Sequence, residues 1–429
     1  MHYTAIKTAV TLSLLAASNV TFAAAMDRSG QSIAPFLQHG NYAEIAYTQI
    51  DPTVSGHYRD GSLISDMAST YDFFTGAVKL QATEQYSFGL LWDHPFGGLA
   101  EYKGNNPLVE DGTTANFKAN TKVDVQSNNL SILIGYRPTP SLSIYGGPVY
   151  QRVEGDVQFA GPGFNFLSGY KNKIESTDGY GWLAGFAYEI PEIALKASLT
   201  YRSEIDHKAE TYEEFQVAGK YAALTPTEKA TTAAGLILGG LTQLVGNPIN
   251  SEFTITTPKS VNLDFQTGIY TDTIAFANVR WVNWKDFTLR PYAFNLASTF
   301  IGQAATKGAY QDGFDLTDYA KDQWSANVGV GHKLNEQWGG SVAVGYDSGA
   351  GNPISTLGPT DGYWSLGLGL RYNPTEKYEI SVGGKYLWLG DAKVQRGDYA
   401  IPGNAANAYV GEFEDNHAWA WGAKLGYRF

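Results

Sequence analysis

The chain has no cysteine among its 429 residues, which excludes a disulfide framework, a thiolate metal site and a cysteine nucleophile. Charged residues are also scarce, at 17% of the chain, against the quarter or so that is usual in soluble proteins. The remaining charge is acidic, with 30 Lys and Arg against 42 Asp and Glu, which argues against nucleic acid as a partner. Glycine and aromatic residues are abundant instead, and such a composition argues against intrinsic disorder.

Long apolar runs are lacking as well. Lys7 precedes a short run at residues 9–17, and small residues follow at 23–25. This pattern predicts a signal peptide over residues 1–25, with cleavage after Ala23 or Ala25, and its alternative is the buried first helix of a soluble protein. Beyond it no window reaches 18 apolar residues, so we expect no transmembrane helix in the mature chain.

From residue 41 onward, apolar residues alternate with small or polar ones. In the last segment, the apolar face consists of Trp419, Trp421, Ala423, Leu425, Tyr427 and Phe429. The opposite face carries Ala, Gly, Lys and Arg. A soluble sandwich keeps its apolar face inside, whereas aromatic residues at the ends of an apolar face are typical of strands with lipid outside and a polar lumen inside.

Fourteen such segments are present in the sequence. We predict strands near 41–50, 70–80, 86–103, 122–137, 141–156, 176–190, 194–210, 251–270, 273–290, 322–334, 338–347, 361–373, 378–394 and 414–429. Short and long connections alternate strictly between them, as periplasmic turns and external loops do in bacterial barrels. Open sheet edges are not viable in a bilayer. The predicted fold is therefore all-β: a closed transmembrane antiparallel β-barrel over residues 41–429, with both ends periplasmic.

Three stretches carry a resemblance to a known family. They are Gly181-Trp182 with the segment 199–204, Pro258-Lys259 with the segment 279–287 (VRWVNWKDF), and the C-terminal segments 321–324 (KDQW), 345–348 (GYDS) and 359–365 (PTDGYWS). Together they resemble the FadL/TodX family of outer-membrane transporters for long-chain fatty acids and aromatic hydrocarbons. The resemblance covers nearly the whole mature chain. It implies a fourteen-stranded barrel plugged by an N-terminal hatch, in the outer membrane of a Gram-negative bacterium.

The hatch departs from the family pattern. The family usually has a longer plug with an Asn-Pro-Ala motif, whereas here only residues 25–40 precede the first strand and that motif is absent. We predict a short hatch segment over residues 26–40, folded into the lumen. Its first residues are Asp27, Arg28, Ser29 and Gly30.

Two long loops carry unexpected apolar residues, which in external loops usually mark binding or contact surfaces. We predict that they form an apolar groove that captures a ligand from outside, and the alternative is two loops that pack on each other as the core of a lid. The groove residues are Phe164, Phe166 and Leu167 in loop 157–175, and Leu236, Ile237, Leu238, Leu241 and Leu244 in loop 211–250.

A fatty acid also needs a partner for its carboxylate, because a desolvated carboxylate is costly without a cation or hydrogen-bond donors. Strand alternation points Arg202 and Lys385 into the lumen near mid-height, and Arg280 lies at a similar height. These three cations are candidate ligand contacts. The alternative is that they pair with other lumen charges or with hatch acids such as Asp27.

One predicted strand contains a break. At the centre of 86–103 the sequence reads Asp93, His94, Pro95, Phe96, Gly97 and Gly98. Proline has no N–H to donate to a neighbouring strand, and glycines after it favour a bulge or kink. We expect this segment to open the wall locally, with Asp93 and His94 satisfying the freed backbone groups. The family resemblance implies the same, since its members have an inward kink that makes a lateral opening here.

Other functions are weakly supported. No two of the seven histidines have metal-ligand spacing, and neither HExxH nor GxSxG occurs, so we predict no enzyme, no metal and no cofactor. The predicted function is passive uptake of hydrophobic small molecules, with long-chain fatty acids as the first substrate candidate. The alternatives are aromatic hydrocarbons as substrates, a general porin or an adhesin. The remaining expected partners are outer-membrane lipid, lipopolysaccharide and, from the aromatic end Gly426-Tyr427-Arg428-Phe429, the outer-membrane assembly machinery.

Overall fold

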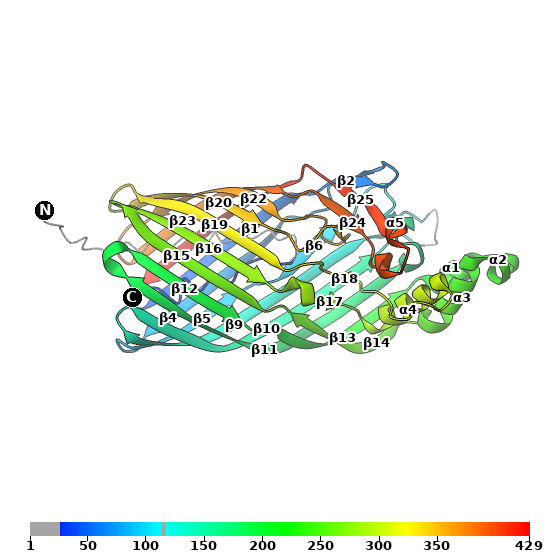
Figure 1. Cartoon of the computed structure of the whole chain (residues 1–429), viewed down its shortest axis with the longest axis horizontal. Helices are drawn as coiled ribbons and strands as arrows, with labels where there is room; N and C mark the ends of the chain where they lie inside the picture. Colours follow the sequence, from blue (N-terminus) through cyan, green and yellow to red (C-terminus); the bar gives the residue numbers. More distant parts are fainter. Residues whose placement is uncertain (1–25, 113–116) are drawn as a thin grey trace.

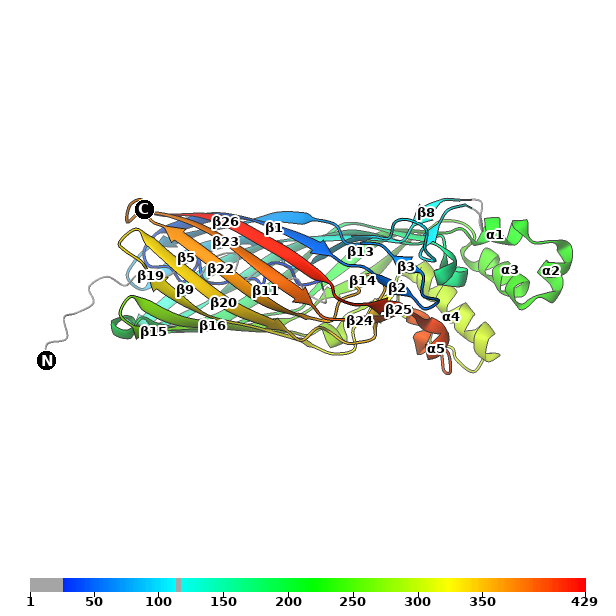
Figure 2. The same cartoon turned by 90° about the horizontal axis from the view of Figure 1, so that it is seen from above.

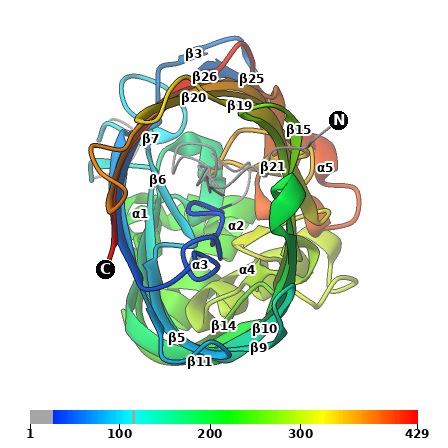
Figure 3. The ribbon, with the colours of Figure 1, turned by 90° about the vertical axis from the view of Figure 1, so that its left-hand side faces the viewer.

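The computed structural model describes residues 26–112 and 117–429, and the predicted signal peptide over residues 1–25 lies outside the described residues. In the described part, the largest sheet has 17 strands and closes on itself as a barrel (Figures 1 and 3). Closure is made by the first and last strands, with Tyr42 paired to Arg428. Three positions around the ring are each filled by two successive strands, so the ring has fourteen positions and the predicted strand number is confirmed.

The divided positions are β5/β6, β12/β13 and β14/β15. The barrel strands are β1 (Tyr42–Thr53), β4 (Tyr71–Gln81), β5 (Tyr86–Asp93), β6 (Gly97–Glu101), β9 (Lys122–Thr139), β10 (Leu142–Phe159), β11 (Tyr170–Ile190), β12 (Leu195–Arg202), β13 (Ile205–Phe215), β14 (Ile249–Thr257), β15 (Ser260–Tyr270), β16 (Thr273–Val282), β19 (Gln323–Lys333), β20 (Trp338–Asp347), β22 (Tyr363–Tyr372), β23 (Tyr378–Leu389) and β26 (His417–Arg428).

The outer face of the barrel is apolar and its lumen is polar. On β22, Leu366 and Leu368 are exposed on the outside, whereas Ser365 is buried inside. Aromatic pairs mark both borders of the apolar band. The ring centres of Trp338 and Tyr372 lie 4.5 Å apart at the end with short turns, and those of Tyr346 and Trp364 lie 4.8 Å apart toward the long loops. This is the girdle arrangement of a membrane-spanning barrel.

The long loops build an external part beyond one end of the barrel (Figure 2). Its helices are α1 (Val217–Ala223), α2 (Pro226–Thr231), α3 (Ala233–Val245), α4 (Tyr292–Thr306) and α5 (Ala405–Ala408). Its short strands are β2 (Gly56–Tyr58), β3 (Leu63–Ile64), β7 (Val109–Glu110), β8 (Ala119–Asn120), β17 (Thr288–Leu289), β18 (Thr317–Asp318), β21 (Ile354–Ser355), β24 (Ala392–Gln395) and β25 (Tyr409–Phe413). The short 3-10 turns of the chain are η2 (Pro162–Leu167), η3 (Pro191–Ile193), η4 (Trp284–Asp286) and η5 (Gly397–Ala400).

The apolar run of loop 211–250 forms the helix α3. Thr232 caps its first turn by accepting a hydrogen bond from the Gly235 N–H at 2.9 Å, and Leu238 and Leu241 are buried. Because residues three and four apart share a helix face, only part of the run needs to be covered. Among the helices of the described chain, none is long and apolar enough to cross a membrane.

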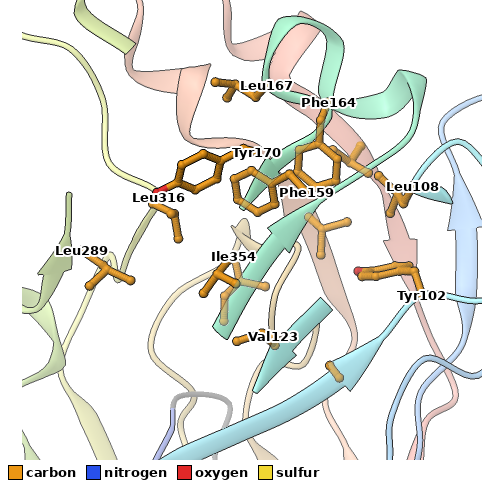
Figure 4. Packing of buried hydrophobic residues seen from close by; sticks show 14 of the residues in the cluster. Tyr102, Leu108, Val123, Phe159, Phe164, Leu167, Tyr170, Leu289, Leu316 and Ile354 are labelled. Carbon is orange, nitrogen blue, oxygen red and sulfur yellow. The ribbon is translucent and has the colours of Figure 1, made fainter. Parts of the chain in front are cut away.

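The larger of the two hydrophobic clusters of the described residues extends from the barrel mouth into the external part. Figure 4 shows Phe159, Phe164 and Tyr170 packed together, and the first two rings are stacked at 4.3 Å. Residues from distant loops, such as Leu316 and Ile354, complete this core. The external loops therefore form a packed lid over the barrel mouth.

The hatch lies inside the barrel, and its last residues are held at the end of the barrel with the short turns, called the lower end. Phe36 fills a notch at Gly89 and Gly135, where an added methyl group would lie 2.4 Å and 3.0 Å from its ring. Lys79 and Lys196 donate hydrogen bonds to the carbonyl groups of Gln38 and Leu37. Lysine side chains commonly satisfy such carbonyls at the end of a helical turn. This end of the hatch forms a floor near the short turns.

Candidate functional site

The predicted break in the third barrel position is present. β5 ends at Asp93 and β6 begins at Gly97. Their shared neighbour β9 pairs Asn129 with Asp93 and Gln126 with Gly97, so three residues on the broken side face two on β9. This is a β-bulge, and it occurs at Pro95, where the missing N–H could not have contributed to a ladder.

On its other side, the broken strand separates from β4. The pairing of β4 with β5 ends at Gly76 and Trp92, and the next contact between the two sides is an isolated bridge from Ala68 to Ala100. Between these points, no strand pairing joins residues 69–75 to residues 93–99 in the described part of the chain. The barrel wall thus has a gap in its hydrogen-bond ladder, which we call the wall gap.

The backbone groups freed by the break are satisfied mainly by partners other than those we expected. The Ser127 hydroxyl on β9 accepts from the Phe96 N–H at 2.8 Å and donates to the Phe96 carbonyl at 2.6 Å. His94 contributes a ring-nitrogen contact to the Ser127 carbonyl at 3.1 Å. Among the described residues Asp93 shows no hydrogen bond to a freed backbone group, and its Oδ1 is buried there without a hydrogen-bond partner. The expectation for Asp93 is therefore wrong, and that for His94 holds only for this one contact.

The hatch supplies the remaining partners from inside the barrel. The Arg28 N–H donates to the Pro95 carbonyl at 2.7 Å, and the Gly97 N–H donates to the Met26 carbonyl at 2.8 Å. Asp27 and Phe96 form an isolated antiparallel bridge between these bonds. The first residues of the hatch thus line the inner side of the wall gap through one isolated bridge and its two flanking hydrogen bonds.

The Arg28 side chain occupies the wall gap itself. Its guanidinium carbon lies 4.3 Å from the ring centre of Tyr71, the first residue of β4. On its other side it abuts Gly97, where an added methyl group would lie 2.5 Å from that carbon. The Arg28 Nε is buried without a hydrogen-bond partner among the described residues. A guanidinium over an aromatic face is an attractive arrangement, stronger when desolvated.

Deeper in the lumen, a polar network fixes the hatch. Arg280 forms a buried ion pair with Asp27 at 2.6 Å and also donates to Asn262 at 2.7 Å. Arg202 donates to the Gln31 carbonyl at 2.5 Å. Asn262 in turn donates to the Gly30 carbonyl at 2.8 Å. Arg280 thus pairs with the hatch acid Asp27, as in the alternative to ligand contact, and Arg202 binds a backbone carbonyl of the hatch. Ser29 of the hatch accepts a local hydrogen bond from the Gln31 N–H at 3.3 Å.

Lys385 is buried in the lumen as predicted, near Asn327 at 3.4 Å. Arg202 also faces inward and lines a small separate pocket together with Gln31 and Phe96. Its Nη1 is buried without a hydrogen-bond partner among the residues that the structure describes. Arg202 thus combines a place in the lining of a pocket with a buried donor that has no partner among the described residues.

A large apolar cavity lies between the hatch, the wall gap and the external lid. The centre of a water molecule could occupy about 160 Å³ of it. Charged lining residues within the described chain are Asp27, Arg28 and Glu154, and the other lining residues are apolar or uncharged. With the bridge residues Ala68 and Ala100 at its border included, seven residues line both the cavity and the wall gap: Ala68, Tyr71, Phe96, Gly97, Gly98, Leu99 and Ala100.

The predicted groove residues lie elsewhere. Phe164 and Leu167 are buried in the lid core and Phe166 packs against it. On α3, Leu238 and Leu241 are buried and Ile237 is partly buried, whereas Leu236 and Leu244 are 61% and 42% exposed. None of these eight residues lines the cavity among the described residues.

The two external loops pack on each other. Lys220 of α1 donates to the Ser168 carbonyl at 2.7 Å and to the Asn165 carbonyl at 3.3 Å. Burial of this ammonium lowers its pKa to about 8. Glu213 at the top of β13 accepts hydrogen bonds from the N–H groups of Ala293 and Phe294, at 2.8 and 2.9 Å. It thereby caps α4, and burial raises the pKa of this carboxyl.

Sequence reasoning missed three residues of the site. Arg28 was assigned only to the hatch, and Tyr71 and Trp284 were assigned no role. Trp284 and Phe287 belong to the W-x-x-W-x-x-F segment that carried the family resemblance, and both line the cavity. That motif was the available signal. Tyr71 offered none, because its role depends on a contact with a distant segment.

Comparison with known proteins agrees with this geometry. A family model described as outer membrane protein transport protein (OMPP1/FadL/TodX) matches residues 39–429. The chain belongs to this family. Members of the family are outer-membrane channels that carry hydrophobic small molecules rather than enzymes, and this chain is accordingly an outer-membrane transporter for hydrophobic compounds.

Solved structures share the fold at low identity. The chain superimposes on a FadL homologue from Pseudomonas aeruginosa with a TM-score of 0.64 at 14% identity, covering 92% of each chain. The toluene transporter TodX of Pseudomonas putida gives 0.58 at 12% identity, with 96% and 97% of the two chains covered. TbuX, the toluene transporter of Ralstonia pickettii, gives a TM-score of 0.57 at 12% identity, with 96% of this chain and 97% of TbuX covered. A search of curated proteins finds no match.

Proposed function

We propose that this transporter lets hydrophobic molecules diffuse passively from the external lid into the apolar cavity and then sideways through the wall gap into the bilayer. The observation that carries this proposal is that seven residues line both the cavity and the wall gap. A ligand that leaves sideways stays out of periplasmic water, and each buried CH₂ is worth about 0.8 kcal/mol. Capture begins at the exposed α3 side chains Leu236 and Leu244.

Long-chain fatty acids are the first substrate candidate. A carboxylate inside the apolar cavity requires a cation or donors, because its desolvation is otherwise too costly. Arg28 lines the cavity and Arg202 lines the adjoining pocket, and each has a buried donor without a partner in the described chain. Phe96, Thr257 and Pro258 line both spaces, so an acyl chain in the cavity would reach Arg202 with its headgroup by passing between these residues.

Aromatic hydrocarbons are the second candidate. Phe96, Trp284, Phe287 and Tyr319 all line the cavity, and edge-to-face contacts link Trp284 to two of these rings. Rings of this kind favour aromatic guests by offset or edge-to-face contacts. The toluene transporters among the related structures support the same reading.

The lateral route is tested by closing the wall gap. Pro95→Val combined with Gly98→Ala restores a donor and reduces backbone freedom, and Gly97 is left unchanged because a methyl group there would collide with Arg28. We expect uptake of a radiolabelled long-chain fatty acid and of toluene to fall at least tenfold, with affinity for the cavity unchanged. A correctly assembled variant that transports at the wild-type rate would exclude the lateral route.

The substrate class is tested by comparing a long-chain fatty acid with its methyl ester. If the acid is the substrate, the ester should bind roughly tenfold more weakly, as expected for one charge-assisted hydrogen bond of about 1.5 kcal/mol. Arg28→Gln and Arg202→Gln should remove this preference. Equal affinities in the unmodified protein would remove the ligand roles of Arg28, Arg202, Arg280 and Lys385 and leave the neutral hydrocarbon as substrate.

A further inference from the structure

Trp284 differs from the other tryptophans of the chain. All ten lie in the described residues, and Trp284 is the one with no exposed surface, whereas most of the others face outward on the barrel wall. It begins the η4 turn after β16 and lines the cavity. Its ring meets Phe96 at 5.4 Å and Phe287 at 5.4 Å, both edge to face, and Tyr319 at 5.1 Å. Trp284 thus lies at the centre of the aromatic lining.

A chain of hydrogen bonds leads away from its indole N–H. That group donates to Gln323 Oε1 at 2.7 Å, and Gln323 Nε2 donates to Asp347 Oδ2 at 2.6 Å. The second carboxylate oxygen, Asp347 Oδ1, accepts from the Gly349 N–H at 2.8 Å. All three side chains are buried, with at most 2% of their surface exposed. Each link has one chemically fixed direction, because indole only donates and carboxylate only accepts.

This relay of hydrogen bonds joins three of the segments that carry the family resemblance. Trp284 comes from the W-x-x-W-x-x-F stretch, Gln323 from the KDQW stretch and Asp347 from the GYDS stretch. Gln323 begins β19 and Asp347 ends β20, and these neighbouring strands pair directly. The relay therefore ties the ring in the cavity to the rigid rim of the barrel.

The relay has a physical consequence for the shape of the cavity. An indole N–H left without an acceptor in an apolar space is costly, so a ring deprived of Gln323 would turn to find another partner. Turning would change its edge-to-face contacts and the width of the space beside it. A flexible acyl or alkyl ligand can adapt to such a change, whereas a flat, rigid aromatic ligand cannot.

We propose that Gln323 and Asp347 are positioning residues that hold the plane of Trp284, and that this plane sets the preference of the cavity for flat aromatic molecules over flexible chains. The inference rests on the proposed function, in which the cavity is the ligand site. It adds a determinant of selectivity that lies outside the lining of the cavity, since neither Gln323 nor Asp347 lines it in the described chain.

The test compares affinities for naphthalene and for decane in purified, detergent-solubilised protein. Gln323→Leu should lower the naphthalene affinity about three- to tenfold, the range of one aromatic contact, and leave the decane affinity within twofold. Gln49→Leu is the matched control, because Gln49 accepts the indole N–H of Trp421 at 2.9 Å on the outer face, away from the cavity. It should change neither affinity.

A rescue variant distinguishes positioning from simple loss of packing. Gln323→Glu alone places two carboxylates in contact and should also shift the ratio of the two affinities. Gln323→Glu with Asp347→Asn rebuilds the relay with its charge moved: the glutamate accepts from Trp284 and from the new amide, whose oxygen still accepts from Gly349. This double variant should restore the wild-type ratio of the two affinities. It should also restore the hydrogen-bond signal of the Trp284 indole in ultraviolet resonance Raman spectra, which is isolated by subtracting the spectrum of Trp284→Phe.

The outcomes separate the two proposals. Suppose that wild-type protein binds both ligands. If the ratio of the naphthalene and decane affinities is then unchanged in Gln323→Leu, or is not restored by the double variant, the positioning role is overturned and the proposed function stands. If wild-type protein binds neither ligand, the proposed function fails and this inference fails with it. Heat-dependent migration of the folded barrel on gels confirms that each variant is assembled before binding is measured.

Discussion

The guanidinium of Arg28 lies face-on to the ring of Tyr71, with 4.3 Å between its central carbon and the ring centre. Arg28 belongs to the hatch and Tyr71 to the edge of β4 that faces the wall gap. Gly97 on the opposite edge leaves the space that the guanidinium occupies. One side chain therefore contacts both edges of the wall gap.

Replacing Arg28 by alanine should speed lateral release. A desolvated cation–π contact is worth about 1–2 kcal/mol, which corresponds to roughly a five- to thirtyfold change in rate if it is lost on the way out. We expect faster efflux of a preloaded hydrophobic fluorophore from protein in lipid vesicles. Efflux at the wild-type rate would show that Arg28 does not obstruct the exit.

Adding one methyl group at Gly97 should have the same effect by a different cause. Gly97→Ala would place its methyl group 2.5 Å from the Arg28 guanidinium carbon and force that side chain out of the wall gap. Gly98→Ala is the matched control, because its methyl group would meet only Met26, at 4.0 Å. Faster efflux in the first variant and not in the second is expected, and equal behaviour of the two would contradict the arrangement.

Breaking the ion pair between Asp27 and Arg280 should loosen the hatch. Asp27→Asn leaves a buried guanidinium without its carboxylate, a change that costs about 3–5 kcal/mol in buried pairs. We expect brief ion-conducting openings in planar bilayers that are rare in the wild-type protein. Asp315→Asn, which removes a carboxylate 2.8 Å from Arg290 in the external part, is the control and should leave the conductance unchanged. A large, steady current through wild-type protein would instead indicate an open porin.

Truncating Glu213 should release α4 from the barrel rim. The carboxylate accepts from two N–H groups at the start of α4 and from the Tyr170 hydroxyl at 2.9 Å. Loss of such a cap costs about 0.5–2 kcal/mol. Glu213→Ala should therefore raise hydrogen exchange in residues 292–306 by up to about thirtyfold, while exchange in the barrel strands stays the same. Unchanged exchange in α4 would show that other contacts hold it.

The packing of the external loops should strengthen at high pH. Burial lowers the pKa of Lys220 to about 8, so its ammonium opposes the packed state wherever an exposed lysine is still protonated. The destabilisation of the packed loops by this ammonium is largest below pH 8. It fades as the pH rises from about 8 toward the pKa of an exposed lysine, near 10.4. Proteolysis of loop 157–175 should slow between pH 7.5 and 9.5, normalised to Lys220→Met, which should show no such slope. A parallel slope in both proteins would exclude Lys220 as the cause.

Much of the barrel followed from the sequence, because strand alternation in a lipid-facing barrel is a local property. The fourteen positions, the alternation of turns and loops, and the break at Pro95 were all readable from neighbouring residues. The strand limits were less accurate: β11 begins at Tyr170, six residues before the predicted start, because the ladder with β10 continues beyond the membrane. The run in loop 211–250 was correctly seen as apolar, but its helix was not predicted.

The site was predicted less well, because it depends on contacts between distant segments. The inward orientation of Arg202 and Lys385 followed from alternation. That Arg280 binds Asp27 and that Arg28 reaches Tyr71 depends on how the hatch folds back through the lumen, and no local pattern encodes that path. Likewise, the eight loop residues chosen for their apolarity form the lid core or its surface, whereas the cavity is lined by residues from many different segments.

The floor that Phe36 makes in its glycine notch has a consequence for the cell as a whole. A barrel of this size would otherwise be an aqueous hole in the outer membrane, open to polar antibiotics and detergents alike. Lys79 and Lys196 hold the end of the hatch at the mouth with the short turns, whereas the proposed exit is the interruption in the side wall. If the ligand leaves by that proposed route, the protein admits compounds that dissolve in membranes without opening a path for solutes that do not.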